Sequence, residues 1–348
     1  MKRAALLLCA VWLFTGPFAR GEADGEIYTM VDEENKKITM RYGKMYEGDE
    51  YISSKNDLYV IVSVDEEKKV AVAEHRGKEP SDAVSVLSAD KKGPNKRILM
   101  YSTHSDESYI PGDGDFSLEK NAGIYDVGER FMEHLEKAGY EVEYSKETFL
   151  PHDAGAYRRS RAVAAEFAKK NPAALIDIHR DGIPAEEYET TVDGKKTSMV
   201  RLFVGKSNSN AAENRAFAKQ LKAYADDEYP GLIKDIYIGK GNYNQDLYPN
   251  AILLEFGTHE IDKKLVMDST EYMAKVLTNV LGEGEESKPA EDAKEGVRGG
   301  GKWILLAILG AGVFALFATG SLKGMGEKLK KGAGEITGGL FSGKKRKK

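Results

Sequence analysis

An alternation of β-prone and helical stretches between residues 96 and 283 constrains the fold more than any other feature. Apolar and β-branched runs predict strands over residues 96–104, 140–149, 173–181, 198–205, 233–241 and 250–257. Helical periodicity predicts helices over 122–138, 156–169, 208–227 and 262–281. This alternation indicates an α/β fold, with a mainly parallel sheet flanked by helices on both faces. In such sheets, ligands bind at the carboxyl ends of the strands.

Three of the predicted strands end on side chains that can bind a metal ion. The run "RILMYSTHSDE" ends on His104 and Glu107, "ALIDIHRDG" on His179, and "AILLEFG" on Glu255. These ends are expected to gather at one edge of the sheet. Two imidazoles and one carboxylate leave the fourth position of a zinc ion open for water, as catalytic zinc sites require. We therefore predict that His104, Glu107 and His179 bind zinc.

A hydrolytic zinc site also needs a carboxylate that does not bind the metal. This group takes a proton from the attacking water and passes it to the leaving amine. Glu255 is the predicted catalytic residue for this role. Asp177 precedes His179 by two residues on the same strand face, where it can accept from the imidazole. The competing interpretation makes His104 a solvated loop residue and the Asp177–His179 pair purely structural.

The other histidines rank lower as members of this site, although His259, four residues past Glu255, could line its rim. His152 directly follows Pro151 and is expected to be a loop residue.

Residues 1–23 have the pattern of a signal peptide. Two basic residues precede an apolar stretch over residues 4–14, and Gly16 and Pro17 follow it. A retained signal anchor is the alternative. The single cysteine, Cys9, lies inside this segment. A cleaved chain would then form no disulfide of its own, and catalysis by a thiolate would be excluded.

The other end of the chain predicts a membrane anchor. Residues 303–322 carry no charge, and about 20 such residues match the thickness of a bilayer at helical rise. The basic segment 323–348 is expected to be a cytoplasmic tail, and the acidic segment 284–301 a flexible linker. We therefore expect a single-pass protein of the cell membrane with its folded part outside. This placement argues against nucleic acid as the partner of "KKRKK".

Residues 24–92 predict a small β domain ahead of the catalytic domain at 96–283. Two β-prone runs surround the turn "DEENK", and two more surround "DEEKK". This segment contains no recognisable group of catalytic residues, and its role is left open.

Four separated motifs resemble the stage II sporulation protein P family. They are "THSDESYIP", "YRRSRAVAAEF", "IDIHRDG" and "YNQDLYPNAILLEFGTHE", within residues 96–281. The resemblance implies zinc-dependent hydrolysis of the peptidoglycan amide between N-acetylmuramic acid and L-alanine. It also implies cleavage between cross-linked stem peptides. The implied partners are stage II sporulation proteins D and M, during engulfment of the forespore.

The resemblance also assigns residues. His104 and His179 match the essential histidines of the family, and Glu255 matches the glutamate of its last strand. Glu119 rivals Glu107 as third ligand because related zinc folds use a residue before the first helix. One departure is that the family is associated with an N-terminal anchor, whereas the apolar segment here is C-terminal. Four residues lie in family motifs and are expected to shape the substrate cleft: Arg180, Asn244, Gln245 and Asp246.

Two other functions stay open at this point. A zinc carboxypeptidase or endopeptidase on stem peptides would use the same ligands, with Arg158, Arg159 or Arg180 available to bind a free carboxylate. A non-catalytic peptidoglycan-binding module would be favoured if a histidine or Glu255 were missing, and none is.

Overall fold

The computed structural model describes residues 26–79, 95–153 and 155–282. The predicted signal peptide (1–23), linker (284–301), membrane span (303–322) and basic tail (323–348) lie outside these residues. Within the described ranges, every helix is too short or too polar for a bilayer crossing.

The strands and helices predicted after residue 96 are all present. The six strands are β6 (Arg97–Tyr101), β7 (Glu141–Tyr144), β8 (Ala174–Asp181), β11 (Val200–Gly205), β12 (Ile233–Gly239) and β13 (Ala251–Thr258). The four helices are α2 (Gly123–Lys137), α3 (Ala156–Lys169), α4 (Ala211–Glu228) and α5 (Lys263–Leu281). Five short elements were not predicted: α1 (Ile110–Asp113), β9 (Glu189–Val192), β10 (Lys195–Ser198) and the 3₁₀ helices η2 (Ala185–Glu187) and η3 (Gln245–Leu247).

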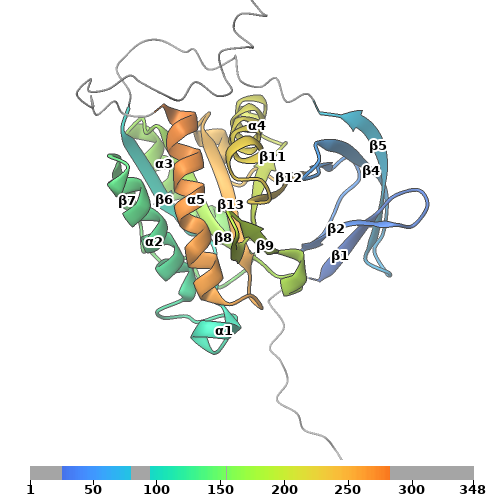
Figure 1. Ribbon diagram of the computed structural model, residues 1–348, viewed down its shortest axis with the longest axis horizontal. Coiled ribbons are helices and arrows are strands. Elements are labelled where there is room, and N and C mark those ends of the chain that lie inside the picture. Colours follow the sequence, from blue (N-terminus) through green and yellow to red (C-terminus); the bar gives the residue numbers. More distant parts are fainter. Residues whose placement is uncertain (1–25, 80–94, 154, 283–348) are drawn as a thin grey trace, which may run out of the picture. The chain divides into compact units, whose positions relative to one another are not determined.

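The N-terminal segment forms five strands: β1 (Ile27–Val31), β2 (Lys37–Tyr42), β3 (Glu50–Ile52), β4 (Asp57–Asp65) and β5 (Val70–Lys78). We call them the β1–β5 unit. Its strands do not form a separate sheet, because β3 pairs with β12 and extends the catalytic sheet (Figure 1). The resulting sheet has the order β2-β1-β5-β4-β3-β12-β11-β13-β8-β6-β7. The expected boundary between the two domains, between residues 92 and 96, adjoins residues 80–94, which lie outside the described chain.

The prediction of a mainly parallel sheet is wrong for the described chain as a whole. Six of the eleven strand pairings are antiparallel. Short turns such as "DEENK" cannot join parallel neighbours, because a parallel pair needs a long crossover. From β12 to β7, however, four of the five pairings are parallel, and only β11–β13 is not.

Helices cover both faces of this part of the sheet, as predicted. Side chains alternate across a strand, so Ile98 of β6 joins the core under α2, α4 and α5, while Leu99 joins the core under α3. Figure 1 shows α2 and α5 side by side over the first face. The β1–β5 unit covers the rest of the second face, where Met30 packs with Phe203 and Tyr237.

Helix α2 illustrates why the predicted elements form. Ile124, Val127, Phe131 and Leu135 recur every three or four residues, and all four are buried. They form one apolar stripe that packs on the sheet. Gly139 follows the helix with a φ of 86°, the left-handed conformation that ends helices most readily on glycine.

A fully buried arginine joins the β1–β5 unit to the catalytic strands. Arg201 of β11 donates from Nε to Oδ1 of Asp235 (2.7 Å) and from Nη1 to Oδ2 of Asp181 (2.7 Å). Its Nη2 donates to Oγ1 of Thr39 (3.1 Å) and to the carbonyl oxygen of Met40 (2.9 Å), both on β2. Two buried carboxylates and one strand of the N-terminal unit therefore depend on one side chain.

Replacing Arg201 by methionine is expected to lower the free energy of unfolding by about 3–5 kcal/mol, because two carboxylates stay buried without their partner. Denaturant unfolding measures this change. Arg130→Met removes a similar side chain from an exposed pair with Glu133 and should cost about 0–1 kcal/mol. Equal losses in the two variants would contradict the role given to Arg201.

Candidate active site

The loop after β6 brings a carboxylate between two imidazoles. Oε1 of Glu107 lies 3.2 Å from Nδ1 of His104 and 3.4 Å from Nδ1 of His179. The ring centroids of the two histidines are 4.8 Å apart. Zinc with tetrahedral bonds of about 2.0–2.1 Å places its ligand atoms about 3.3 Å from one another. The donor types of these three residues, and the two distances from the Glu107 oxygen, therefore fit a zinc ion.

Glu107 is the negative charge at the centre of this group. Burial opposes its ionisation, but the charge of His179 and the hydrogen bonds from both imidazoles hold its pKa well below the usual range. Burial also lowers the pKa of His179, yet Asp177 and Glu107 together raise it well above its usual value. Burial lowers the pKa of His104. The centre thus pairs the ionised carboxylate of Glu107 with the positive charge of His179.

Neighbouring groups fix the orientation of the predicted ligands. Nε2 of His179 lies 3.1 Å from Oδ1 of Asp177, as expected from their spacing, although the contact lacks hydrogen-bond geometry. Asp177 accepts from the backbone N–H (2.8 Å) and hydroxyl (2.7 Å) of Thr103. The backbone N–H of Arg180 donates to Oε2 of Glu107 (2.9 Å). Carboxylate partners of this kind are typical of histidines that bind metals.

Glu255 lies beside this group on the next strand. It pairs in register with His179, so both side chains point to the face that α3 and the β1–β5 unit cover. The hydroxyl of Tyr188 donates to Oε2 of Glu255 (3.2 Å), and Nη1 of Arg201 lies 3.6 Å from the same oxygen. Burial, followed by the charge of Asp181, raises the pKa of Glu255 to about 8. A carboxyl group that titrates near neutral pH can both accept and return a proton.

His152 lies in a loop, as expected, but it also lines this site. Its ring stacks on His104 with centroids 3.9 Å apart, and its Nδ1 lies 3.0 Å from Oδ1 of Asp106. His104, Glu107 and His152 form a second set that could hold a metal ion, with ligand atoms within 4.8 Å of one another. No local spacing predicts this, because the contact joins segments 46 residues apart along the chain.

A cleft of about 90 Å³ opens onto these residues. Its lining contains His104, Glu107, His152, His179 and Glu255, together with Arg41 and Tyr42 of the β1–β5 unit. Glu119, the rival of Glu107, is exposed and lies outside this lining.

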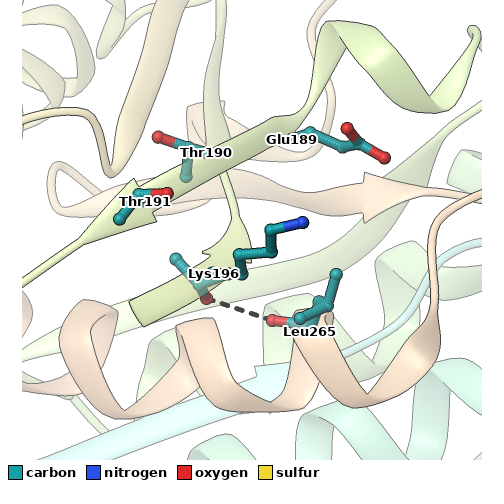
Figure 2. Close-up of a pocket in the computed structure, with 6 residues that line it drawn as sticks. Glu189, Thr190, Thr191, Lys196 and Leu265 are labelled. Atoms are coloured by element: carbon teal, nitrogen blue, oxygen red, sulfur yellow. Dashed lines mark hydrogen bonds between the residues drawn. The ribbon is translucent and has the colours of Figure 1, made fainter. Parts of the chain in front are cut away.

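A second cavity, of about 260 Å³, lies between the β9–β10 hairpin and α5 (Figure 2). It shares no residue with the cleft, and its polar lining is one lysine, one glutamate and three threonines. The chemistry of the side chains, not the size of the cavity, therefore places the candidate site in the first cleft.

The predicted cleft residue Arg180 mainly holds a loop in place. It lines the cleft, but Nε donates to the carbonyl oxygen of Ser108 (3.0 Å) and Nη2 to that of Phe116 (2.8 Å). The loop that carries His104 and Glu107 is thereby fixed to β8.

The other three predicted cleft residues support the loop before β13. Asn244 donates to the carbonyl oxygen of Tyr157 (2.9 Å), Gln245 donates to that of Phe203 (2.9 Å), and Asp246 pairs with Arg161 (2.6 Å). Asn244 also lines a neighbouring pocket of about 310 Å³ with Tyr157, Arg158, Arg161 and Tyr243. These residues therefore shape the surroundings of the cleft without contacting its histidines.

Comparisons with known proteins found a relative and several similar structures. Stage II sporulation protein P of Bacillus subtilis (strain 168) is 30% identical over 216 residues, which cover 57% of this chain and 54% of that protein. The chain thus spans about half the length of this relative.

Two solved structures share a low similarity with the chain. The N-acetylmuramoyl-L-alanine amidase AmiC2 of Nostoc punctiforme is 16% identical with a TM-score of 0.35, covering 54% of this chain and 97% of that one. The CwlD amidase from Clostridioides difficile, solved with the GerS lipoprotein, is 15% identical with a TM-score of 0.36, covering 54% and 96%. These values are too low to support a conclusion about activity.

The family comparison is decisive, because it spans most of the chain. The model of the family described as stage II sporulation protein P matches residues 22–278, which include the β1–β5 unit as well as the candidate site. The chain therefore belongs to the stage II sporulation protein P family.

Proposed function

We propose that this chain is a zinc-dependent N-acetylmuramoyl-L-alanine amidase that hydrolyses peptidoglycan during sporulation. The observation that carries the proposal is the position of Glu107 between His104 and His179, at 3.2 and 3.4 Å, with Glu255 in the same cleft. Membership of the sporulation family supports the cell wall as the substrate.

Each residue of the site has a role in this proposal. His104, Glu107 and His179 would hold the zinc ion. When bound, the zinc ion would polarise the carbonyl group of the substrate and lower the pKa of a bound water to about 7. Glu255 accepts a proton from the attacking water and donates it to the amine of L-alanine as the amide bond breaks. Tyr188 keeps the carboxylate of Glu255 in place through its hydroxyl.

Hydrolysis of a bond within the stem peptide is the second candidate. Arg158 and Arg161 line the pocket next to the cleft, and because Asp246 already pairs with Arg161, the carboxylate of a stem peptide could bind at Arg158. The same catalytic residues would then act as a carboxypeptidase or endopeptidase. A non-catalytic peptidoglycan-binding module is the third candidate.

The proposal extends to the setting of the reaction. We place the folded part outside the cell membrane, anchored by residues 303–322, with stage II sporulation proteins D and M as partners. The apolar segment and the basic tail of the sequence support the anchor.

Mass spectrometry of purified peptidoglycan after digestion by the full-length chain tests the proposed reaction. We expect stem peptides with a free L-alanine amino group, and we expect a chelator to abolish their release. Shortened stems with an intact lactyl amide would establish the peptidase instead. Absence of any chelator-sensitive product would favour the binding module and refute the enzyme.

A further inference from the structure

The β1–β5 unit contributes an arginine to the wall of the catalytic cleft. Arg41 and Tyr42, at the end of β2, line the same cleft as His179 and Glu255. No sequence motif indicated that the N-terminal segment reaches the candidate site. The β1–β5 unit therefore forms part of the surface of the candidate active site.

Contacts with the catalytic strands hold this end of β2 in position. The backbone N–H of Tyr42 donates to Oδ1 of Asp181 (3.3 Å), which ends β8. Arg201 of β11 donates to the carbonyl oxygen of Met40 (2.9 Å). Arg41 lies between these two anchored residues, so the strands that carry His179 and Glu255 also fix its backbone.

The side chain of Arg41 is equally well fixed, but it is not fully hydrogen bonded. Its guanidinium lies 5.0 Å from the ring centroids of both Phe203 and Tyr237, and Nη1 donates to the carbonyl oxygen of Lys44. Nε is buried and has no hydrogen-bond partner among the described residues. Buried N–H groups are nearly always paired in native proteins. An exception at the wall of a cleft indicates a partner that is not part of the chain.

Sheet register places this guanidinium across the cleft from the histidines. His179 of β8 is paired with Glu255 of β13, which is paired in turn with β11, the strand of Phe203. Arg41 lies over Phe203 on β11 and Tyr237 on β12. Glu255 therefore lies between the His104–Glu107–His179 group and Arg41. A substrate whose amide lies between that group and Glu255 extends toward Arg41.

We propose that Arg41 binds a carboxylate on the peptide part of the substrate, close to the bond that is cut. The inference rests on the proposed amidase function. Nε and the adjacent Nη of a guanidinium form a fork that matches the two oxygens of a carboxylate, and Arg binds such groups more strongly than neutral ones. The β1–β5 unit would thereby help to select substrates by the charge of their peptide.

Calorimetric binding to the full-length chain tests this without requiring turnover. The probes are a short stem peptide beginning with L-alanine with one free side-chain carboxylate, and the same peptide with that group as a carboxamide. We expect the wild-type chain to bind the carboxylate about 10- to 100-fold more tightly. Arg41→Gln should abolish this preference. Arg41→Lys, which keeps the charge but loses the fork, should retain a few-fold preference.

Lys44→Gln is the matched control, because Lys44 is a partly exposed cation of the same unit and pairs with Glu66. It should keep the full preference for the carboxylate. Equal affinity of the wild-type chain for both peptides, or no binding of either, would overturn the proposal. A preference that survives in Arg41→Gln would do the same. Should Arg41→Gln fail to fold, an unchanged preference in Arg41→Lys would refute the fork.

Parallel digestion of peptidoglycan separates this proposal from the proposed function. If stem peptides are released in a chelator-sensitive way but the preference for the carboxylate does not depend on Arg41, the carboxylate site is refuted and the amidase function stands. An Arg41-dependent preference without release of stem peptides refutes the amidase alone. A loss of kcat in Arg41→Gln that is equal for carboxylate and carboxamide substrates would assign Arg41 to the scissile carbonyl instead.

Discussion

Replacing Glu255 by glutamine is expected to lower kcat for amide hydrolysis about 10²- to 10⁴-fold, the range typical of general acid–base groups. Glutamine keeps the size of the side chain and can still accept the hydrogen bond from Tyr188, so the cleft should keep its shape. It has no basic oxygen to take the proton of the attacking water. Because Glu255 is not a proposed ligand, bound zinc per chain should not change.

Single-turnover rates together with the zinc content of the purified variant measure both parts of this prediction. Glu271→Gln is a suitable control, since Glu271 is half-exposed on α5, pairs with Lys275 and lies outside the lining of the cleft. It should leave kcat and zinc content unchanged. A fully active Glu255→Gln variant would remove Glu255 from the mechanism. Loss of zinc from that variant would instead make Glu255 a ligand.

His179→Ala is expected to lose both bound zinc and activity. The variant removes one of three proposed ligands, and it leaves Asp177 and Glu107 in the core without the imidazole that lies between them. Zinc per chain after dialysis, measured by elemental analysis, should fall from one to near zero. Circular dichroism shows whether the variant stays folded.

Two further alanine variants distinguish the possible ligand sets. His152→Ala should keep its zinc if His179 completes the site, whereas the set His104–Glu107–His152 requires the reverse result. Glu119→Ala should keep its zinc because Glu119 is exposed outside the cleft. Loss of zinc from Glu119→Ala, with none from Glu107→Ala, would contradict the choice of Glu107.

Local patterns predicted the parts of the structure that depend on one strand or helix. The apolar period of α2 and the runs of β8 and β13 located these elements to within a few residues. His104, His179 and Glu255 were expected to meet because parallel strands end at one edge of a sheet, and they do line one cleft, on the neighbouring strands β6, β8 and β13. The approach of Asp177 to His179 followed from the two-residue repeat of a strand.

The parts that were missed depend on contacts between distant segments. The directions of the strands that lie beyond β13 on its β11 side were not predictable. Strand β11 runs antiparallel to β13, and the β1–β5 unit joins the sheet through the antiparallel pairing of β3 with β12. His152 reaches the site from the segment after β7. Arg41 reaches it from β2, which is the edge strand at the opposite end of the sheet from β7. Neither position leaves a local signal, since each is set by packing between elements more than 40 residues apart.

The pairing of β3 with β12 has a consequence for how the chain folds. Ile52 and Ile236 are partners in this ladder, so the edge of β3 stays open until almost the whole folded region has been synthesised. Closing so long a loop is entropically costly and makes folding slow. An unpaired strand edge is meanwhile a template for association with other chains. We therefore expect the N-terminal strands to be prone to aggregation until β12 has formed, and truncation before residue 233 to leave that edge open permanently.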